Sequence, residues 1–156
     1  VSYPLDSGCI AYNPAGIVNL CNRLDVGLYN VFNFGSTKVR GNLNPVINRV
    51  DTNTRIWAYS PEVGGVYHLN KNLAFGLSIY NEKDLRVKYS KSFPLLGTTP
   101  VGFEYILEVV APSVAAKFFD HHAFSLTLNY MVQRLRIKGL ERLESFSESP
   151  NFVTNK

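Results

Sequence analysis

The sequence lacks any long apolar run, and it has little charge and little cysteine. No stretch of about 20 apolar residues occurs in the 156 residues, so no transmembrane helix is expected. That absence does not exclude a membrane β-barrel, whose strands give a much weaker signal per segment. Charged residues make up 18% of the chain and apolar residues 46%, a composition that argues against disorder and for one domain with a sizeable core.

The net charge is only +4, and the basic residues are scattered along the chain. One looser cluster contains Arg134, Arg136, Lys138 and Arg142. A nucleic-acid surface usually concentrates such residues on one face, so no nucleic-acid partner is expected. Aromatic residues are frequent, with 9 Tyr, 10 Phe and 1 Trp. Tyr and Phe are favoured in strands and in the interfacial girdles of membrane barrels.

Cys9 and Cys21 are the only cysteines, and two cysteines cannot build a zinc site alone. Two interpretations stay open. The pair is either two free or buried thiols, or a disulfide that staples the N-terminal segment in an oxidising compartment.

Apolar and polar residues alternate with a period of two along most of the chain, and no convincing helical pattern is present. Side chains of a strand point alternately to its two faces. Residues 73–89 give the clearest pattern, with an apolar face from Leu73 to Tyr89 and a small or polar face from Ala74 to Lys88. The sequence therefore predicts an all-β, antiparallel fold whose strands cover 24–35, 59–69, 73–89, 103–118 and 123–137.

Three positions are expected to disturb these strands. Pro112 cannot donate to a ladder, which predicts a bulge or an unpaired position. The alternation reverses its phase at 134–137, which indicates a bulge or the end of the buried span. Residues 73–81 match the roughly 9–11 that a tilted strand needs to cross a bilayer core. A kink, or the exit of the strand from a membrane, is expected just beyond, at the polar interruption made by Asn81, Glu82, Lys83 and Asp84.

The connections alternate between long and short. The long ones are 36–58, 90–102 and 138–156, and the short turns are 70–72 and 119–122. Outer-membrane barrels place short turns on the periplasmic side and long loops outside. Every connection fits this single topology, with residues 1–23 as an irregular N-terminal segment on the periplasmic side.

Five strands of this kind do not close into a barrel, because bacterial barrels have an even strand number of at least about eight. An open edge in lipid would leave backbone N–H and C=O groups unpaired, each costing roughly several kcal/mol. We therefore expect more strands or other chains to complete the sheet, and we do not expect this chain to fold alone. Val1 is not an initiator Met, so the chain is expected to start after processing or to be a fragment.

The segment Asn13-Pro14-Ala15-Gly16, placed just before the amphipathic strand that begins at Leu24, resembles the hatch and first strand of the FadL/TodX family of outer-membrane transporters. The later stretch from Ala111 to Phe118, followed by a tight turn and Phe124, also looks like the strand–turn–strand units of that family. The cysteine pair is not part of the family pattern.

This resemblance implies a barrel of fourteen strands in the Gram-negative outer membrane, plugged by an N-terminal hatch at 1–23. Strands at 24–137 would be its first five, and 138–156 would begin an extracellular loop. The implied function is passive uptake of hydrophobic compounds such as long-chain fatty acids, without a cofactor. The ligand would leave sideways at the third strand, where Asn81 to Asp84 are the candidate irregularity. Implied partners are the fatty acid and the surrounding lipid or lipopolysaccharide.

No pattern in the sequence indicates catalysis or a metal site. His121 and His122 are adjacent on a predicted strand end and would point to opposite faces, so a polar turn is the better interpretation. No Gly-x-Ser-x-Gly or phosphate-binding glycine loop is present. We therefore do not expect an enzyme. Two alternatives stay open, a soluble lipocalin-like ligand-binding barrel and a structural or adhesive surface protein with a filled lumen.

Overall fold

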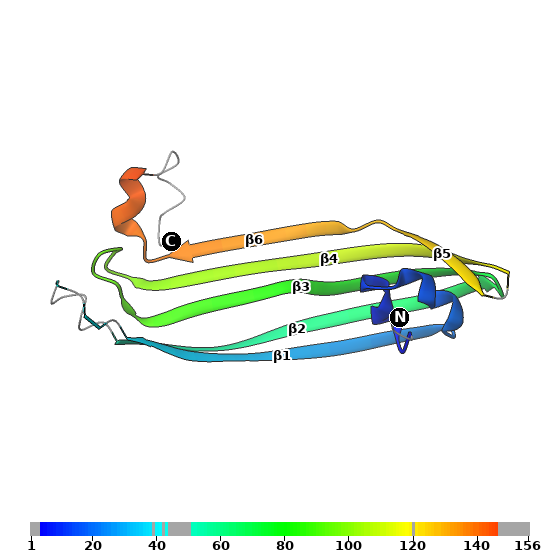
Figure 1. The fold of residues 1–156 in the computed structure, drawn as a ribbon, viewed down its shortest axis with the longest axis horizontal. Coiled ribbons are helices and arrows are strands. Elements are labelled where there is room, and N and C mark those ends of the chain that lie inside the picture. The colour runs from blue at the N-terminus through cyan, green and yellow to red at the C-terminus, as the bar shows by residue number, and fades with distance from the viewer. Residues whose placement is uncertain (1–3, 39, 42, 44–50, 120, 147–156) are drawn as a thin grey trace. The chain divides into compact units, whose positions relative to one another are not determined.

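The computed structural model describes residues 4–38, 40–41, 43, 51–119 and 121–146 as an antiparallel β-sheet with three short 3-10 helices (Figure 1). Within this part of the chain the strands are β1 (Arg23–Lys38), β2 (Asp51–Asn70), β3 (Leu73–Ser92), β4 (Pro100–Phe118), β5 (His122–Thr127) and β6 (Tyr130–Lys138). They follow the order β1-β2-β3-β4-β5, and β6 pairs with β4. The predicted all-β, antiparallel class is confirmed.

Two strand predictions need correction. The strand predicted at 59–69 begins earlier, at Asp51. The first half of this strand shows no regular alternation in the sequence, because polar residues such as Thr54 and Arg55 are mixed with Ile56 and Trp57. The predicted connection at 36–58 is shorter for this reason, and its residues 39, 42 and 44–50 lie outside the described part. The polar segment predicted at 138–156 contains a 3-10 helix, η4 (Glu141–Phe146).

The single strand predicted at 123–137 is divided into β5 and β6 by Leu128 and Asn129. Ser113 pairs with Thr127 in the β4–β5 register, which places Pro112 opposite Leu128. The Leu128 amide donates to the Pro112 carbonyl at 3.0 Å, but Pro112 has no N–H with which to return the bond. The disturbance expected at Pro112 is therefore found on the partner strand. The break precedes 134–137, where the reversed alternation predicts a bulge or the end of the buried span, and β6 runs through these residues without interruption.

The chain divides into two compact units, each made of three separate stretches. The first unit contains Val1–Tyr29, Tyr59–Lys83 and Leu107–Gln133, and the second contains Asn30–Ala58, Asp84–Ile106 and Arg134–Lys156. Each unit is described by itself below.

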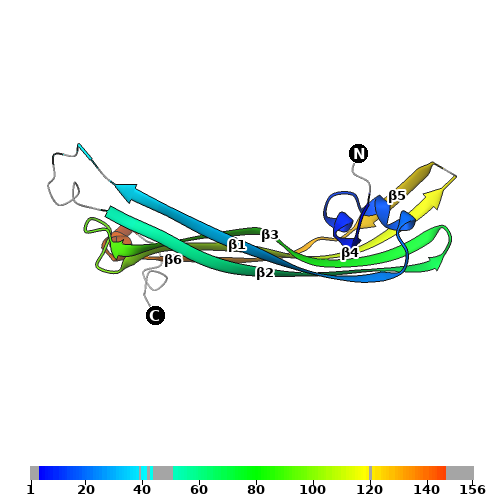
Figure 2. The same ribbon diagram turned by 90° about the horizontal axis from the view of Figure 1, so that it is seen from below.

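In the first unit, two 3-10 helices lie against one face of the sheet (Figure 2). They are η1 (Ser7–Ala11) and η2 (Pro14–Asn19), in a segment that the sequence predicts to be irregular. Asp6 caps η1 by accepting a hydrogen bond from the Gly8 amide, and Pro14 begins η2 at its first position, where no N–H is needed. We call residues 4–22 the N-terminal segment, and the sheet face beneath it the covered face.

The core of the first unit lies between the N-terminal segment and the covered face. Four residues of the segment and five of the strands make one buried apolar cluster: Cys9, Ile10, Ile17 and Val18, with Val66, Ala74, Val109, Ala111 and Ala115. The strand residues are mostly small, which lets the helices approach the backbone closely. A Cβ added at Gly76 would lie 2.7 Å from Ile10 Cδ1, and one added at Gly64 would overlap Ser7.

The opposite face of the same unit, which we call the open face, carries large apolar side chains. On β3, residues 74, 76 and 78 are buried, while Phe75, Leu77 and Ile79 between them are exposed. On β5, Phe124 and Leu126 are exposed and pair with Ala116 and Val114 of β4. Phe75, Leu77 and Ile79 belong to the apolar face that the sequence predicts for 73–89, and in the structure this face points away from the N-terminal segment.

In the second unit, hydrogen bonds from side chains connect three consecutive strands of the sheet. The Asn33 side-chain amide on β1 donates to the Arg86 carbonyl on β3 at 3.3 Å, although β2 lies between these strands. Thr54 of β2 is buried, and its hydroxyl accepts from the Lys88 amide at 3.3 Å. These two hydrogen bonds therefore connect β3 with both β1 and β2. Phe32 packs against Trp57 with ring centroids 4.5 Å apart.

A sharp turn after β6 brings η4 back to the preceding loop of the second unit. Gly139 has a φ of +79°, which a side chain would strain, and an added Cβ would lie 2.7 Å from Val101 Cα. The Arg142 amide then donates to the Leu96 carbonyl at 2.9 Å, and Glu141 accepts from Thr99. In the described residues, no helix is long and apolar enough to cross a membrane.

The close approach at Gly64 gives a test of this packing. In a Cys21→Ser background, the only thiol is Cys9, which is buried in the core cluster. Gly64→Ala should push Ser7 away and weaken docking of the N-terminal segment by about 1–3 kcal/mol. Cys9 should then be alkylated faster by a maleimide.

The neighbouring Gly65→Ala variant is the matched control. A Cβ at Gly65 meets only ordinary contacts, the nearest at 3.5 Å from the Arg23 carbonyl oxygen. This variant should leave the alkylation rate of Cys9 unchanged. Equal rates for Gly64→Ala and Gly65→Ala would contradict the packing described.

Candidate functional site

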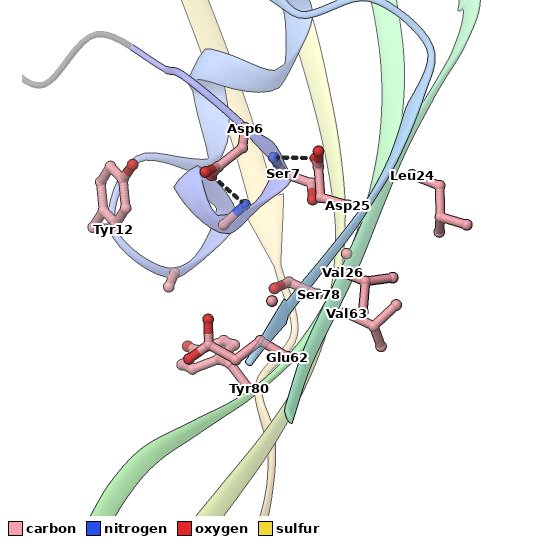
Figure 3. A pocket seen from close by; sticks show the side chains of 14 residues that line it. Asp6, Ser7, Tyr12, Leu24, Asp25, Val26, Glu62, Val63, Ser78 and Tyr80 are labelled. Carbon is pink, nitrogen blue, oxygen red and sulfur yellow. Dashed lines mark hydrogen bonds between the residues drawn. The ribbon is translucent and has the colours of Figure 1, made fainter. Parts of the chain in front are cut away.

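A cavity of about 580 Å³ opens in the first unit between η1 and strands β1, β2 and β3 (Figure 3). Ligand pockets in proteins usually measure about 300–1,000 Å³, so this space is large enough for a small molecule. The N-terminal segment contributes Asp6 to Gly8, Ala11 and Tyr12, and the strands contribute 24–27, 62–64, Ser78 and Tyr80.

Polar side chains reach the cavity from the covered face. Figure 3 shows Asp6, Glu62, Ser78 and Tyr80 on the side of the N-terminal segment. The side chains of Leu24, Val26 and Val63 point away, toward the open face (Figure 3). Within this small region, one face of the sheet is polar and the other is apolar.

A salt bridge on β1 holds the N-terminal segment beside the cavity. Arg23 contacts Asp25 through two hydrogen bonds, from Nε at 2.7 Å and from Nη2 at 2.6 Å. Asp25 Oδ2 also accepts from the Ser7 amide at 2.9 Å (Figure 3), and Arg23 Nη1 donates to the Leu5 carbonyl at 2.9 Å. The pair thus ties the chain at residues 5 and 7 to the first strand.

His68 makes a second attachment at the other end of the segment. Its Nε2 lies 2.6 Å from the Leu20 carbonyl oxygen, and its backbone amide donates to Asn22 Oδ1 at 2.7 Å. These partners lie 46 and 48 residues before His68 in the chain. Arg23, Asp25 and His68 were not predicted as site residues, because the contacts that each makes with the N-terminal segment join positions 18 or more residues apart.

The motif predicted from the resemblance, Asn13 to Gly16, forms the start of η2. Asn13 is the N-cap residue and its carbonyl accepts from the Gly16 amide at 2.9 Å. Gly16 is buried, and a Cβ there would lie 3.0 Å from Pro4 Cβ. Pro14, Ala15 and their neighbours therefore shape the turn that brings Ile17 onto the sheet, and they do not line the cavity.

Cys9 and Cys21 are both free in the structure, so the disulfide that the sequence left open is not formed. Cys9 is buried in the core cluster and Cys21 is exposed. Burial, followed by the nearby Asp6 carboxylate, raises the pKa of the Cys9 thiol to about 11. Cys9 therefore stays protonated and poorly reactive at neutral pH while the N-terminal segment is docked.

The kink predicted at Asn81, Glu82, Lys83 and Asp84 is not seen as a break, because β3 runs through these residues without interruption. The regular alternation of burial that starts at Ala74 ends at Tyr80, so the packing changes there although the strand continues. Asp84 is held by Arg86, whose Nε and Nη2 lie 2.7 and 2.9 Å from its two carboxylate oxygens.

The described residues contain no group of three or more His, Cys, Asp or Glu side chains that could hold a metal ion. His121 and His122 are exposed at the start of β5, and Asp120 beside them lies outside the described part. The arrangement around the cavity holds the N-terminal segment against the sheet and presents polar side chains to the enclosed space.

Asp25 gives a direct test of the attachment. In the Cys21→Ser background, Asp25→Asn should remove the charge from the bonds to Arg23 and Ser7. Hydrogen bonds to charged groups contribute about 1.5–3 kcal/mol, so Cys9 should be alkylated roughly ten times faster or more.

Asp84→Asn is the control, because Asp84 makes the same pairing with an Arg two residues away but contacts no part of the N-terminal segment. Cys9 should react in this variant as it does in the parent protein. Protection of Cys9 that persists in Asp25→Asn would show that the salt bridge does not hold the segment.

The chain was compared with known families, proteins and structures. Searches against protein-family models, curated proteins and solved structures find no match to this chain.

Proposed function

We propose that the chain is part of an outer-membrane β-barrel, similar to the FadL/TodX transporters, that carries hydrophobic compounds across the membrane passively. The N-terminal segment would be the hatch of this barrel and the covered face its lumenal wall. The open face would contact membrane lipid and lipopolysaccharide. Long-chain fatty acids are the ligand class that the resemblance suggests.

The distribution of side chains in the first unit carries the proposal. Large apolar residues such as Leu77 and Phe124 are exposed on the open face, whereas small and polar residues lie under the N-terminal segment. A soluble lipocalin-like barrel would bury its large apolar side chains inside. A membrane barrel needs the opposite arrangement, because lipid surrounds it and its lumen is polar.

Aromatic residues on β2 support the same orientation. Tyr59 and Tyr67 are 59% and 61% exposed and share the open face with Val63 between them. Eight residues of strand extend over roughly 26 Å, and a tilt of about 40° reduces the vertical distance to about 20 Å. Aromatic girdles flank an apolar band of about 25 Å in membrane barrels, so Val63 would lie near the middle of the bilayer.

Transport would use the cavity under the hatch. The segment closes one face of the sheet through a few hydrogen bonds and a small apolar core, both of which can be undone without breaking the strands. A hydrophobic solute entering from outside would meet this plug, and movement of the plug would let it pass down its gradient. No cofactor or covalent step is required by this scheme.

Val63→Arg and Glu62→Arg test the proposal as a matched pair. The two residues are adjacent on β2 and point to opposite faces (Figure 3). Arginine on the lipid face near the bilayer midplane costs about 2–4 kcal/mol, so Val63→Arg should lose most of its membrane insertion. Glu62→Arg, on the lumenal side, should insert as the parent protein does.

Insertion would be measured in the protein as the cell makes it, by detergent-dependent extraction and by a change of gel mobility on boiling. A protein that is extracted without detergent, or Val63→Arg that inserts as well as Glu62→Arg, would contradict the proposal. Binding of a radiolabelled fatty acid by the inserted protein would then test the ligand class.

A further inference from the structure

A hollow in the second unit gathers positive charge on one face of the sheet. It measures about 250 Å³, and its lining includes Arg86 and Lys88 of β3, Arg136 and Lys138 of β6, and one carboxylate, Glu104 of β4. The sequence shows Arg136 and Lys138 in a looser basic cluster, but it does not indicate that Arg86 and Lys88 lie beside them. The sheet creates it, because β3 and β6 both pair with β4.

The spacing of the basic residues within β3 and within β6 brings their side chains to the same hollow. Arg86 and Lys88 are two residues apart, as are Arg136 and Lys138, so each pair shares a face of its strand. Gly102 of β4 leaves room between them, since a Cβ there would already lie 3.8 Å from Lys138 Cβ.

The backbone under this hollow is fixed by its own hydrogen bonds. The Lys88 amide donates to Thr54 Oγ1 and the Arg86 carbonyl accepts from the Asn33 side chain, both at 3.3 Å. The strand that presents two of the four cations is therefore anchored to both β1 and β2. Such anchoring fixes the backbone from which Arg86 and Lys88 extend before any ligand arrives, which reduces the entropy lost on binding.

The charges in the hollow do not balance. Arg86 is paired with Asp84, but no carboxylate of the described residues forms an ion pair with Lys88, Arg136 or Lys138. Glu104 offsets one of these three cations. A surplus of two positive charges remains in a hollow large enough for a small polar group.

We propose that this hollow binds a phosphate group in its dianionic form, as a phosphate monoester or inorganic phosphate. A phosphate monoester carries about −1.5 to −2 charges at pH 7, which matches the surplus, whereas a carboxylate would neutralise only half of it. The planar Arg136 guanidinium can donate two parallel hydrogen bonds to phosphate oxygens, and the lysine ammonium groups add point charges around them. This site does not depend on the transport function proposed above.

Binding would be measured by titration calorimetry on the protein purified in an uncharged detergent, with inorganic phosphate, dodecyl phosphate and dodecanoate as probes. Either phosphate compound should bind more tightly than dodecanoate. Dodecyl phosphate binding more tightly than inorganic phosphate identifies the headgroup of an amphiphile as the source, and equal affinities identify the free phosphate group. Dodecanoate binding as tightly as dodecyl phosphate would overturn the proposal.

Two variants on β6 distinguish binding of phosphate in the hollow from a general effect of the net positive charge. Arg136→Gln should weaken phosphate binding roughly tenfold or more, because it removes a charge-assisted contact. Arg134→Gln removes the same charge two residues away, outside the residues that line the hollow, and should leave the affinity unchanged. Equal losses in both variants, or no phosphate binding by the parent protein, would overturn the proposal. An unchanged far-ultraviolet circular dichroism spectrum would confirm that both variants are folded, whether or not the chain forms a membrane barrel.

Discussion

The packing of Ile10 and Ile17 onto a sheet face made of small residues determines how the first unit is organised. Gly64 and Gly76 allow the 3-10 helices to approach the strands, and the resulting cluster buries Cys9 with Val109. Because the N-terminal segment occupies this face, the large apolar residues of the same strands are left on the other one. A soluble protein would have to cover that second face, whereas a bilayer covers it without further protein.

The polar attachments matter because the apolar cluster under the segment is small. Asp25 and His68 hold the two ends of the segment, at Ser7 and at Leu20. These contacts are charge-assisted or short, yet each involves only one or two side chains, and neither is part of the ladder of β1 to β4. In the transport function proposed above, the segment would serve as a plug that is held in place and is still removable.

The sequence predicted the sheet well because alternation of period two depends only on neighbours along the chain. It found the apolar faces of β3 and β5 and the effect of Pro112, although the break falls on the partner strand. The first half of β2 was missed because polar residues such as Thr54, which is buried in the structure, are mixed there with Ile56 and Trp57. The attachment of Ser7 to Asp25 and the cations around Gly102 depend on strand pairing, which no local pattern in the sequence reveals.

The central claim is that the open face contacts lipid while the covered face does not. The most direct test starts from a variant in which both native cysteines are replaced. A single cysteine is introduced at Val63 or at Glu62 and labelled with an environment-sensitive fluorophore, and the labelled protein is reconstituted into vesicles. Lipids with a spin label deep in the acyl chain should quench the fluorophore at Val63 strongly and the one at Glu62 weakly. Equal quenching at both positions, or none at Val63, would contradict the account.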